Sequence, residues 1–125
     1  MIQISFDKLI VSKNKTDYKS WRARLRTKTW WQENTERKLE GRKERFAYLI
    51  VLIKLYFGTQ RTRDIDNYMG SVDVKGIIDG IVSCELIPDD DAAHLNYSVD
   101  LLIDKENPRT EVILYGTKEN NEYFR

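Results

Sequence analysis

A segment that is apolar at nearly every position, residues 46–57, constrains the fold more than any other part of this sequence. It is rich in aromatic and β-branched residues, which favour β-strands. A strand that is apolar at nearly every position is typical of the centre of a sheet covered on both faces. Periodicity alone leaves a buried helix open, but Gly58 and the aromatic content favour the strand. Lys54 interrupts the run, which is too short to span a membrane.

Weaker patterns predict the elements around this strand. Alternating apolar residues predict strands, and apolar residues at i, i+3, i+4 and i+7 predict a helix with Ser71 at its start. Thr29 can cap an earlier, shorter helix. The expected elements are a strand over 2–6, an irregular basic loop over 7–28, helices over 29–44 and 71–84, and strands over 95–103 and 111–115. This order predicts a single α+β domain over residues 1–125, with one mixed sheet and helices on one face.

The net charge of +1 conceals a strong division of charge along the chain. Residues 1–63 hold 16 Lys and Arg against 6 Asp and Glu, whereas residues 64–125 hold 5 against 14. Basic clusters attract polyanions, and clustered carboxylates repel them unless cations intervene. A nucleic-acid enzyme with bound metal would reconcile the two halves. A chance distribution that cancels in the folded chain remains the alternative.

Other features exclude several classes of protein. No secretion signal or membrane-spanning run is visible, and a single cysteine, Cys84, fits a reducing environment, so we expect a cytoplasmic protein. Cys84 and the only histidine, His94, do not suggest a zinc site. No pattern predicts a small-molecule cofactor or a membrane partner.

Carboxylates are concentrated at Asp64 and Asp66, at Asp79, and at residues 89–91. In an extended segment residues i and i+2 point the same way, so Asp64 and Asp66 can converge, with Ile65 facing the core. A third carboxylate from the 89–91 loop would complete a site for a hard divalent cation such as Mg²⁺. Such a cation can activate water and orient a phosphodiester. Solvated turns are the alternative reading of the same spacing.

The segment Arg63-Asp64-Ile65-Asp66-Asn67 resembles the Arg-Asp-x-Asp-Asn signature of RusA-type Holliday-junction resolvases. In that family a lysine that opens a helix, an aspartate four residues later and an Asp-Asp element follow. Lys75, Asp79 and the segment Leu86 to Asp91 match this order. The intervening segment, residues 68–74, is longer by several residues than in the family.

The resemblance implies a RusA-like fold and a Mg²⁺-dependent crossover junction endodeoxyribonuclease. It would cut Holliday junctions by phosphodiester hydrolysis, in DNA recombination and repair. Asp64, Asp66 and Asp90 would be the catalytic metal ligands, with Asp89 and Asp91 as rivals for Asp90. Lys75 would contact the scissile phosphate, although an ion pair with Asp79 is an equal alternative for it. Arg61 and Arg63 would contact DNA beside the site, or would instead have a structural role in neutralising Asp64.

The basic tract before the strand supplies further candidate DNA contacts and is interleaved with Tyr18 and Trp21. These contacts are Lys13, Lys15, Arg22, Arg24 and Arg26. A junction with near two-fold symmetry also implies a homodimer with two equal sites. Two other classes remain open: a catalytically inactive relative that binds branched DNA, and a structural or interaction module with merely solvated acidic loops.

Overall fold

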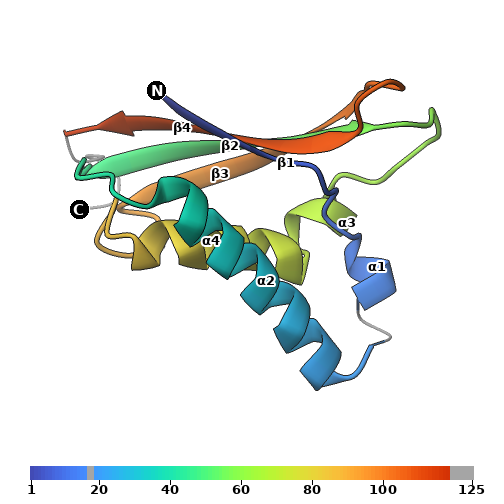
Figure 1. The fold of residues 1–125 in the computed structure, drawn as a ribbon, viewed down its shortest axis with the longest axis horizontal. Helices are drawn as coiled ribbons and strands as arrows, with labels where there is room; N and C mark the ends of the chain where they lie inside the picture. The colour runs from blue at the N-terminus through green and yellow to red at the C-terminus, as the bar shows by residue number, and fades with distance from the viewer. Residues whose placement is uncertain (17–18, 119–125) are drawn as a thin grey trace.

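In the computed structural model, which describes residues 1–16 and 19–118, one sheet and a layer of helices face each other (Figure 1). The sheet has four strands in the order β1-β4-β2-β3. The strands are β1 (Ile2–Phe6), β2 (Tyr48–Phe57), β3 (Leu95–Ile103) and β4 (Arg109–Thr117). The helices are α1 (Lys13–Thr16), α2 (Trp21–Leu39), α3 (Asp66–Met69) and α4 (Val72–Ser83). The predicted α+β class, with a mixed sheet and helices on one face, is confirmed.

The strand β2 is the centre of this arrangement, as its apolar sequence predicts. It pairs in parallel with β3 and antiparallel with β4, while β1 pairs antiparallel with the other edge of β4. Parallel neighbours need a crossover connection. The segment that contains α3 and α4 is this crossover, so every residue of the Arg63–Asn67 motif lies on the path from β2 to β3.

The core lies between the sheet and the two long helices. Alternate residues of β2, from Leu49 to Phe57, are buried against α2 and α4. The helices approach each other closely at two glycines of α4. A Cβ atom on Gly76 would lie 2.4 Å from the backbone oxygen of Lys28, and one on Gly80 would lie 2.9 Å from that of Gln32. Trp31, fully buried, fills the space beside this crossing.

The helix α4 and the strand β3 follow the sequence patterns closely. Ser71 caps α4, because its Oγ accepts a hydrogen bond from the backbone N–H of Val74. The strand β3 has its predicted bounds, and β4 extends the predicted segment by two residues at each end. The patterns at these elements are set by burial of one face, so they can be read from the sequence alone.

The prediction for residues 7–44 is partly wrong. The helix α2 begins at Trp21, not Thr29, and is capped by Ser20, whose Oγ accepts from the N–H of Ala23. A short helix, α1, also lies within the segment that was expected to be irregular. The reason is that none of residues 21–30 is buried, so this part of α2 has no apolar periodicity.

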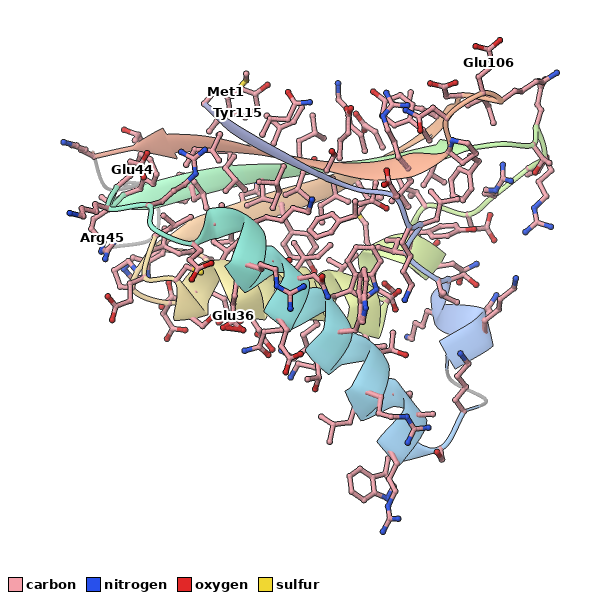
Figure 2. The ribbon with its side chains drawn as sticks, viewed as in Figure 1. Met1, Glu36, Glu44, Arg45, Glu106 and Tyr115 are labelled. Carbon is pink, nitrogen blue, oxygen red and sulfur yellow. The ribbon has the colours of Figure 1, made fainter. Side chains whose placement is uncertain are left out.

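The second expectation that fails is coverage of the sheet on both faces. Within the described residues both long helices lie on one face, and the opposite face of the sheet is uncovered (Figure 1). Tyr115 and Met1 lie on this uncovered side and are 45% and 80% exposed (Figure 2). In the part of the chain that the structure describes, no helix is long and apolar enough to cross a membrane.

Candidate functional site

The Arg63–Asn67 motif forms a helical turn after the loop that leaves β2. The N–H of Asn67 donates to the carbonyl of Asp64 at 3.2 Å, and the N–H of Tyr68 donates to that of Ile65 at 3.0 Å. The expected extended segment is therefore wrong, and so is its consequence that Asp64 and Asp66 point the same way. Ile65 does not face the core, since it is 49% exposed. Buried Tyr68, packed edge-on against Phe57, fixes the turn instead.

Asp64 lines a pocket of about 240 Å³ on the loop side of α3. Its neighbours there include Asn67, three residues later in the turn, and Arg61. Ser12 and Asn14 complete the same pocket, which brings the start of α1 beside the motif. Carboxylate, amide and guanidinium groups from three segments thus meet at this pocket.

Arg63 holds the loop after β2 in place through contacts with the end of β2 and with the loop itself. Its guanidinium lies 3.9 Å from the ring centre of Phe57 and donates to the Oγ1 of Thr59 at 3.1 Å and the carbonyl of Arg61 at 3.3 Å. Among the described residues no ion pair joins Arg61 or Arg63 to Asp64. The alternative of direct neutralisation is therefore not borne out, and a phosphate contact by the remaining N–H groups stays a prediction.

Asp90 lines a different pocket, of about 210 Å³, together with Lys75. Gly70 and Met69, at the end of α3, form part of its wall. Lys75 is exposed in the first turn of α4 and has no ion pair within the described residues. The alternative pairing with Asp79 is wrong, because Asp79 instead lies 2.9 Å from the Nζ of Lys28 on α2.

Asp89 and Asp91, the sequence neighbours of Asp90, make hydrogen bonds within the turn that contains all three residues. Asp89 Oδ1 accepts from the N–H of Asp90 at 2.8 Å. Asp91 Oδ1 accepts from the N–H of Ala93 at 3.0 Å and lies 2.6 Å from Nδ1 of His94. These contacts favour Asp90 over Asp89 and Asp91 as the residue that is available in the pocket.

The three predicted metal ligands are not gathered at one point. Among residues 1–16 and 19–118 no three His, Cys, Asp or Glu side chains form a group that could hold a metal ion. The helical turn explains this, because residues i and i+2 of a helix lie on nearly opposite sides. Asp66 therefore shares its side with Met69 and Gly70, toward the Asp90 pocket, whereas Asp64 shares its side with Asn67. A magnesium ion held by Asp64, Asp66 and Asp90 together does not fit this arrangement.

The predicted DNA contacts lie on α1 and on the first half of α2. Lys13 and Lys15 belong to α1, and the Cδ of Lys13 lies 3.5 Å from the position of a Cβ on Gly70. The first half of α2 extends past α4, away from the sheet (Figure 1). It carries Arg22, Arg24, Arg26 and the exposed indole of Trp21. Tyr18 lies outside the described residues.

Sequence reasoning missed Asp73, a fully buried carboxylate in the first turn of α4. Its Oδ2 accepts from Nε1 of Trp31 at 2.7 Å and from the N–H of Val11 at 3.0 Å, while its buried Oδ1 has no partner within the described residues. Burial raises the pKa of Asp73, and the two donors partly oppose this. Asp73 thus joins α4, which carries Lys75, to α2 and to the segment before α1.

The sequence matches none of the models of known protein families, and no curated protein matches it.

Proposed function

We propose that this chain is a RusA-type crossover junction endodeoxyribonuclease that binds four-way DNA junctions and cuts them in the presence of Mg²⁺. One observation carries the proposal. The Arg63–Asn67 motif lies between a pocket lined by Asp64 and Arg61 and a pocket lined by Asp90 and Lys75. The α3 turn separates these two pockets, each of which pairs an aspartate of the signature with a basic side chain.

The basic residues around this turn suit a DNA backbone. Arg61 lies in the Asp64 pocket, and α1, with Lys13 and Lys15, borders it. The exposed first half of α2 continues the positive surface. Because each phosphate contact releases counterions, junction binding should weaken steeply with salt. Lys75, exposed beside the second pocket, is placed to balance charge on a phosphate.

Magnesium in nucleic-acid enzymes commonly binds one or two carboxylates, several waters and the phosphates of the substrate. The donors present, aspartate and asparagine oxygens, are of the type that this ion prefers. Because the three aspartates do not meet in the described structure, the proposed reaction does not use an ion held by all of them.

The same separation of the aspartates favours a second candidate, a branched-DNA-binding relative without nuclease activity. It would use the same basic surface and would need no cation for affinity. The two functions differ in a single measurable property, which is strand cleavage.

The experiment incubates the purified chain with an end-labelled synthetic four-way junction, with and without Mg²⁺. Paired, symmetric, ligatable nicks that require Mg²⁺ support the nuclease. Asp64→Asn should then abolish cutting but keep the gel shift, while Asp100→Asn, an exposed aspartate on the uncovered sheet face, should leave both unchanged. A gel shift without nicks supports the inactive binder. Neither a shift nor nicks would contradict both and leave an unrelated module.

A further inference from the structure

The strand β3 is the longer of the two edges of the sheet. In the order β1-β4-β2-β3 it pairs only with β2 within the described residues, and it runs for nine residues, Leu95–Ile103. The other edge strand, β1, has five residues. Exposed edges invite pairing with another chain, and proteins usually protect them with lysine, proline or a bulge. β3 contains no lysine, arginine or proline and pairs in continuous register, so its edge is open to an added strand.

Two hydrogen bonds establish which main-chain groups of β3 point outward. The N–H of Leu49 donates to the carbonyl of His94 at 2.9 Å, and the N–H of Asp104 donates to that of Phe57 at 2.9 Å. In a parallel pair such bonds recur at every second residue. Even-numbered residues from 94 to 104 therefore face β2, and the N–H and C=O groups of residues 97, 99, 101 and 103 point away from the sheet. Among the described segments none outside the sheet bonds to these four N–H groups.

A pocket that combines apolar walls with arginine lies at the carboxyl end of this edge. It has a volume of about 260 Å³ and is lined by Leu101 and Ile103 of β3, Phe57 of β2, and Arg61 and Arg63 of the following loop. Arg61 has no ion pair within the described residues, and the buried Nε of Arg63 has no hydrogen-bond partner there. The pocket therefore suits an apolar side chain with a carboxylate beside it.

The pocket of about 210 Å³ that contains Lys75 and Asp90 lies at the amino end of the same edge. Leu95 and Tyr97 of β3 line it, together with Met69. Side chains of a strand return to the same face at every second residue, so residues 97 and 101 face the same side. A strand added at this edge would therefore present side chains four residues apart to the two pockets.

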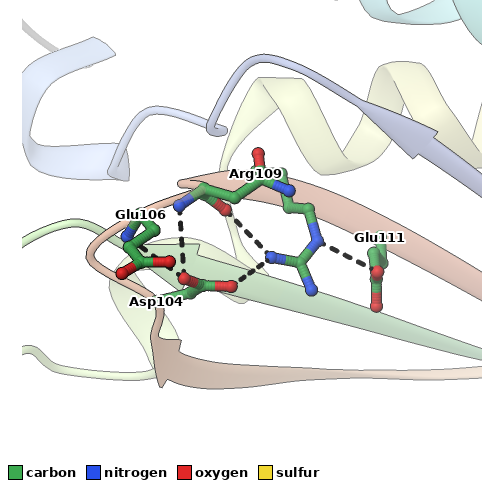
Figure 3. Close-up of polar contacts among 5 residues, drawn as sticks. Asp104, Glu106, Arg109 and Glu111 are labelled. Carbon is green, nitrogen blue, oxygen red and sulfur yellow. Dashed lines mark hydrogen bonds and ion pairs between the residues drawn. The ribbon is translucent and has the colours of Figure 1, made fainter.

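The charges along the edge favour an acidic partner. Two arginines and one lysine line the two pockets, against a single carboxylate, that of Asp90. Asp104, which follows β3, is already neutralised. Its Oδ2 lies 2.8 Å from Nη1 of Arg109, and its Oδ1 accepts from two backbone N–H groups (Figure 3). Asp100 projects from the opposite face, since its register partner Lys54 lies between buried residues of β2.

We propose that the edge of β3 binds an extended segment of another protein, apolar at alternate positions and with an aspartate or glutamate at the end that reaches Arg61. The main chain of this segment would pair with residues 97–103 and supply affinity, while its side chains in the two pockets would supply specificity. Nucleic acid is a poorer occupant of this edge, because it has no main-chain N–H and C=O groups that could continue the sheet.

Under the proposed function, on which this consequence rests, the bound segment would regulate cutting. It would cover the pocket of Lys75 and Asp90 and would therefore compete with a DNA junction for the candidate site. The experiments that test the binding contain no DNA. A chain without nuclease activity would therefore still give the expected peptide binding, and failure of one proposal is distinguishable from failure of the other.

The test selects peptides that bind the full chain from a phage-displayed library. Random segments of about twelve residues are long enough to span the nine residues of β3. We expect the selected peptides to have apolar residues at alternate positions and an acidic residue near one end. Fluorescence polarisation then measures the affinity of the most frequent peptide. A selection that yields no peptide of this pattern overturns the proposal.

The variants Leu101→Pro and Leu101→Ala test pairing with the main chain. Both remove the leucine side chain, but only proline removes the outward N–H, and at this position it removes no bond to β2. We expect Leu101→Pro to bind the peptide about tenfold more weakly than Leu101→Ala, as loss of one main-chain hydrogen bond implies. Thermal unfolding checks that both variants fold. Equal affinities of the two folded variants overturn the proposal.

Arg61→Glu tests the charge at the end of the edge and does not alter the strand. It should weaken binding about tenfold, as loss of one charge-assisted hydrogen bond implies. A peptide with lysine in place of its acidic residue should bind this variant better than it binds wild type. Arg22→Glu, the same change on the part of α2 that extends away from the sheet, should leave the affinity unchanged (Figure 1).

Two further outcomes would overturn the proposal. Equal losses of affinity in Arg61→Glu and Arg22→Glu would indicate a general attraction of anions to the chain. A wild-type chain that dimerises without peptide in sedimentation equilibrium, and loses this dimerisation in Leu101→Pro but not in Leu101→Ala, would show that a second copy occupies the edge.

Discussion

Replacement of Asp73 tests how the helical layer is held together. Its carboxylate is fully buried and is the acceptor for two donors, Trp31 Nε1–H and Val11 N–H. Asp73→Ala removes the acceptor and leaves both donors without it. A buried donor left unsatisfied, such as Trp31 Nε1–H, costs about 1–3 kcal/mol, and the partly buried N–H of Val11 costs less.

The loss of unfolding free energy in Asp73→Ala is reduced, because the wild-type chain must bury a carboxylate with one oxygen that has no partner within the described residues. We therefore expect Asp73→Ala to lower the free energy of unfolding by about 3 kcal/mol. At about 4 °C per kcal/mol for a domain of this size, the midpoint of thermal unfolding should fall by about 12 °C. Urea unfolding followed by tryptophan fluorescence measures this, since Trp31 lies at the altered contact. Asp100→Ala, at an exposed position, is the control.

The pH dependence of the free energy of unfolding provides a second test of the role of Asp73. Burial raises the pKa of Asp73 above its ordinary value of 3.8, so its contribution to stability is fully present below that value. The contribution is lost as the pH rises through the raised pKa of the folded state. Asp73→Asn cannot ionise and keeps an acceptor oxygen. The stability of this variant relative to wild type should therefore improve between pH 3 and pH 7. An Asp73→Ala variant within about 0.5 kcal/mol of wild type, or a relative stability of Asp73→Asn that does not change with pH, would refute the reasoning.

Three further predictions concern the helices and the basic surface. Gly76→Ala should lower the free energy of unfolding by about 2 kcal/mol, because the added Cβ would overpack against the backbone of Lys28. Gly70→Ala is the control and should cost much less, since the nearest atoms to its added Cβ lie at 3.5 Å. Urea unfolding compares the two variants. Replacing Arg22, Arg24 and Arg26 together by Ala should reduce the slope of log K against log salt for junction binding by about 2.7, at about 0.9 for each phosphate contact. Thermal stability should stay unchanged. A slope equal to that of wild type would show that these three side chains of α2 do not contact DNA. Trp21→Ala should weaken junction binding in gel shifts by about tenfold, as loss of one base-stacking contact of about 1–3 kcal/mol implies, while Trp21→Phe retains most of the affinity.

Helices and strands that bury one face and expose the other could be predicted from the sequence. The helix α4 shows its apolar face and its Ser71 cap, and β3 alternates along its whole length. The first half of α2 could not be found in this way, because a helical segment without buried residues leaves no apolar period. Ser20, the actual cap, was the one local signal there.

The candidate site was predicted in composition but not in geometry. The sequence indicates which residues approach the motif, and Lys75 and Asp90 do line one pocket. The pairing of Asp64 with Asp66 failed because it assumed an extended backbone, whereas Ile65 has helical dihedral angles. The partner of Asp79 lies on α2, and no spacing within α4 reveals a contact to another helix.

The close contacts that Gly76 and Gly80 of α4 make with α2 divide α2 into two parts with different roles. Residues 31–39 of α2 are anchored in the core, while residues 21–27, beyond the crossing at Lys28, include no buried side chain. This outer stretch can change its sequence without altering the packing of the domain. Under the proposed function, it is therefore the part of the chain where preference among DNA substrates can diverge, in nature or in a library of variants, while the scaffold that presents it stays the same.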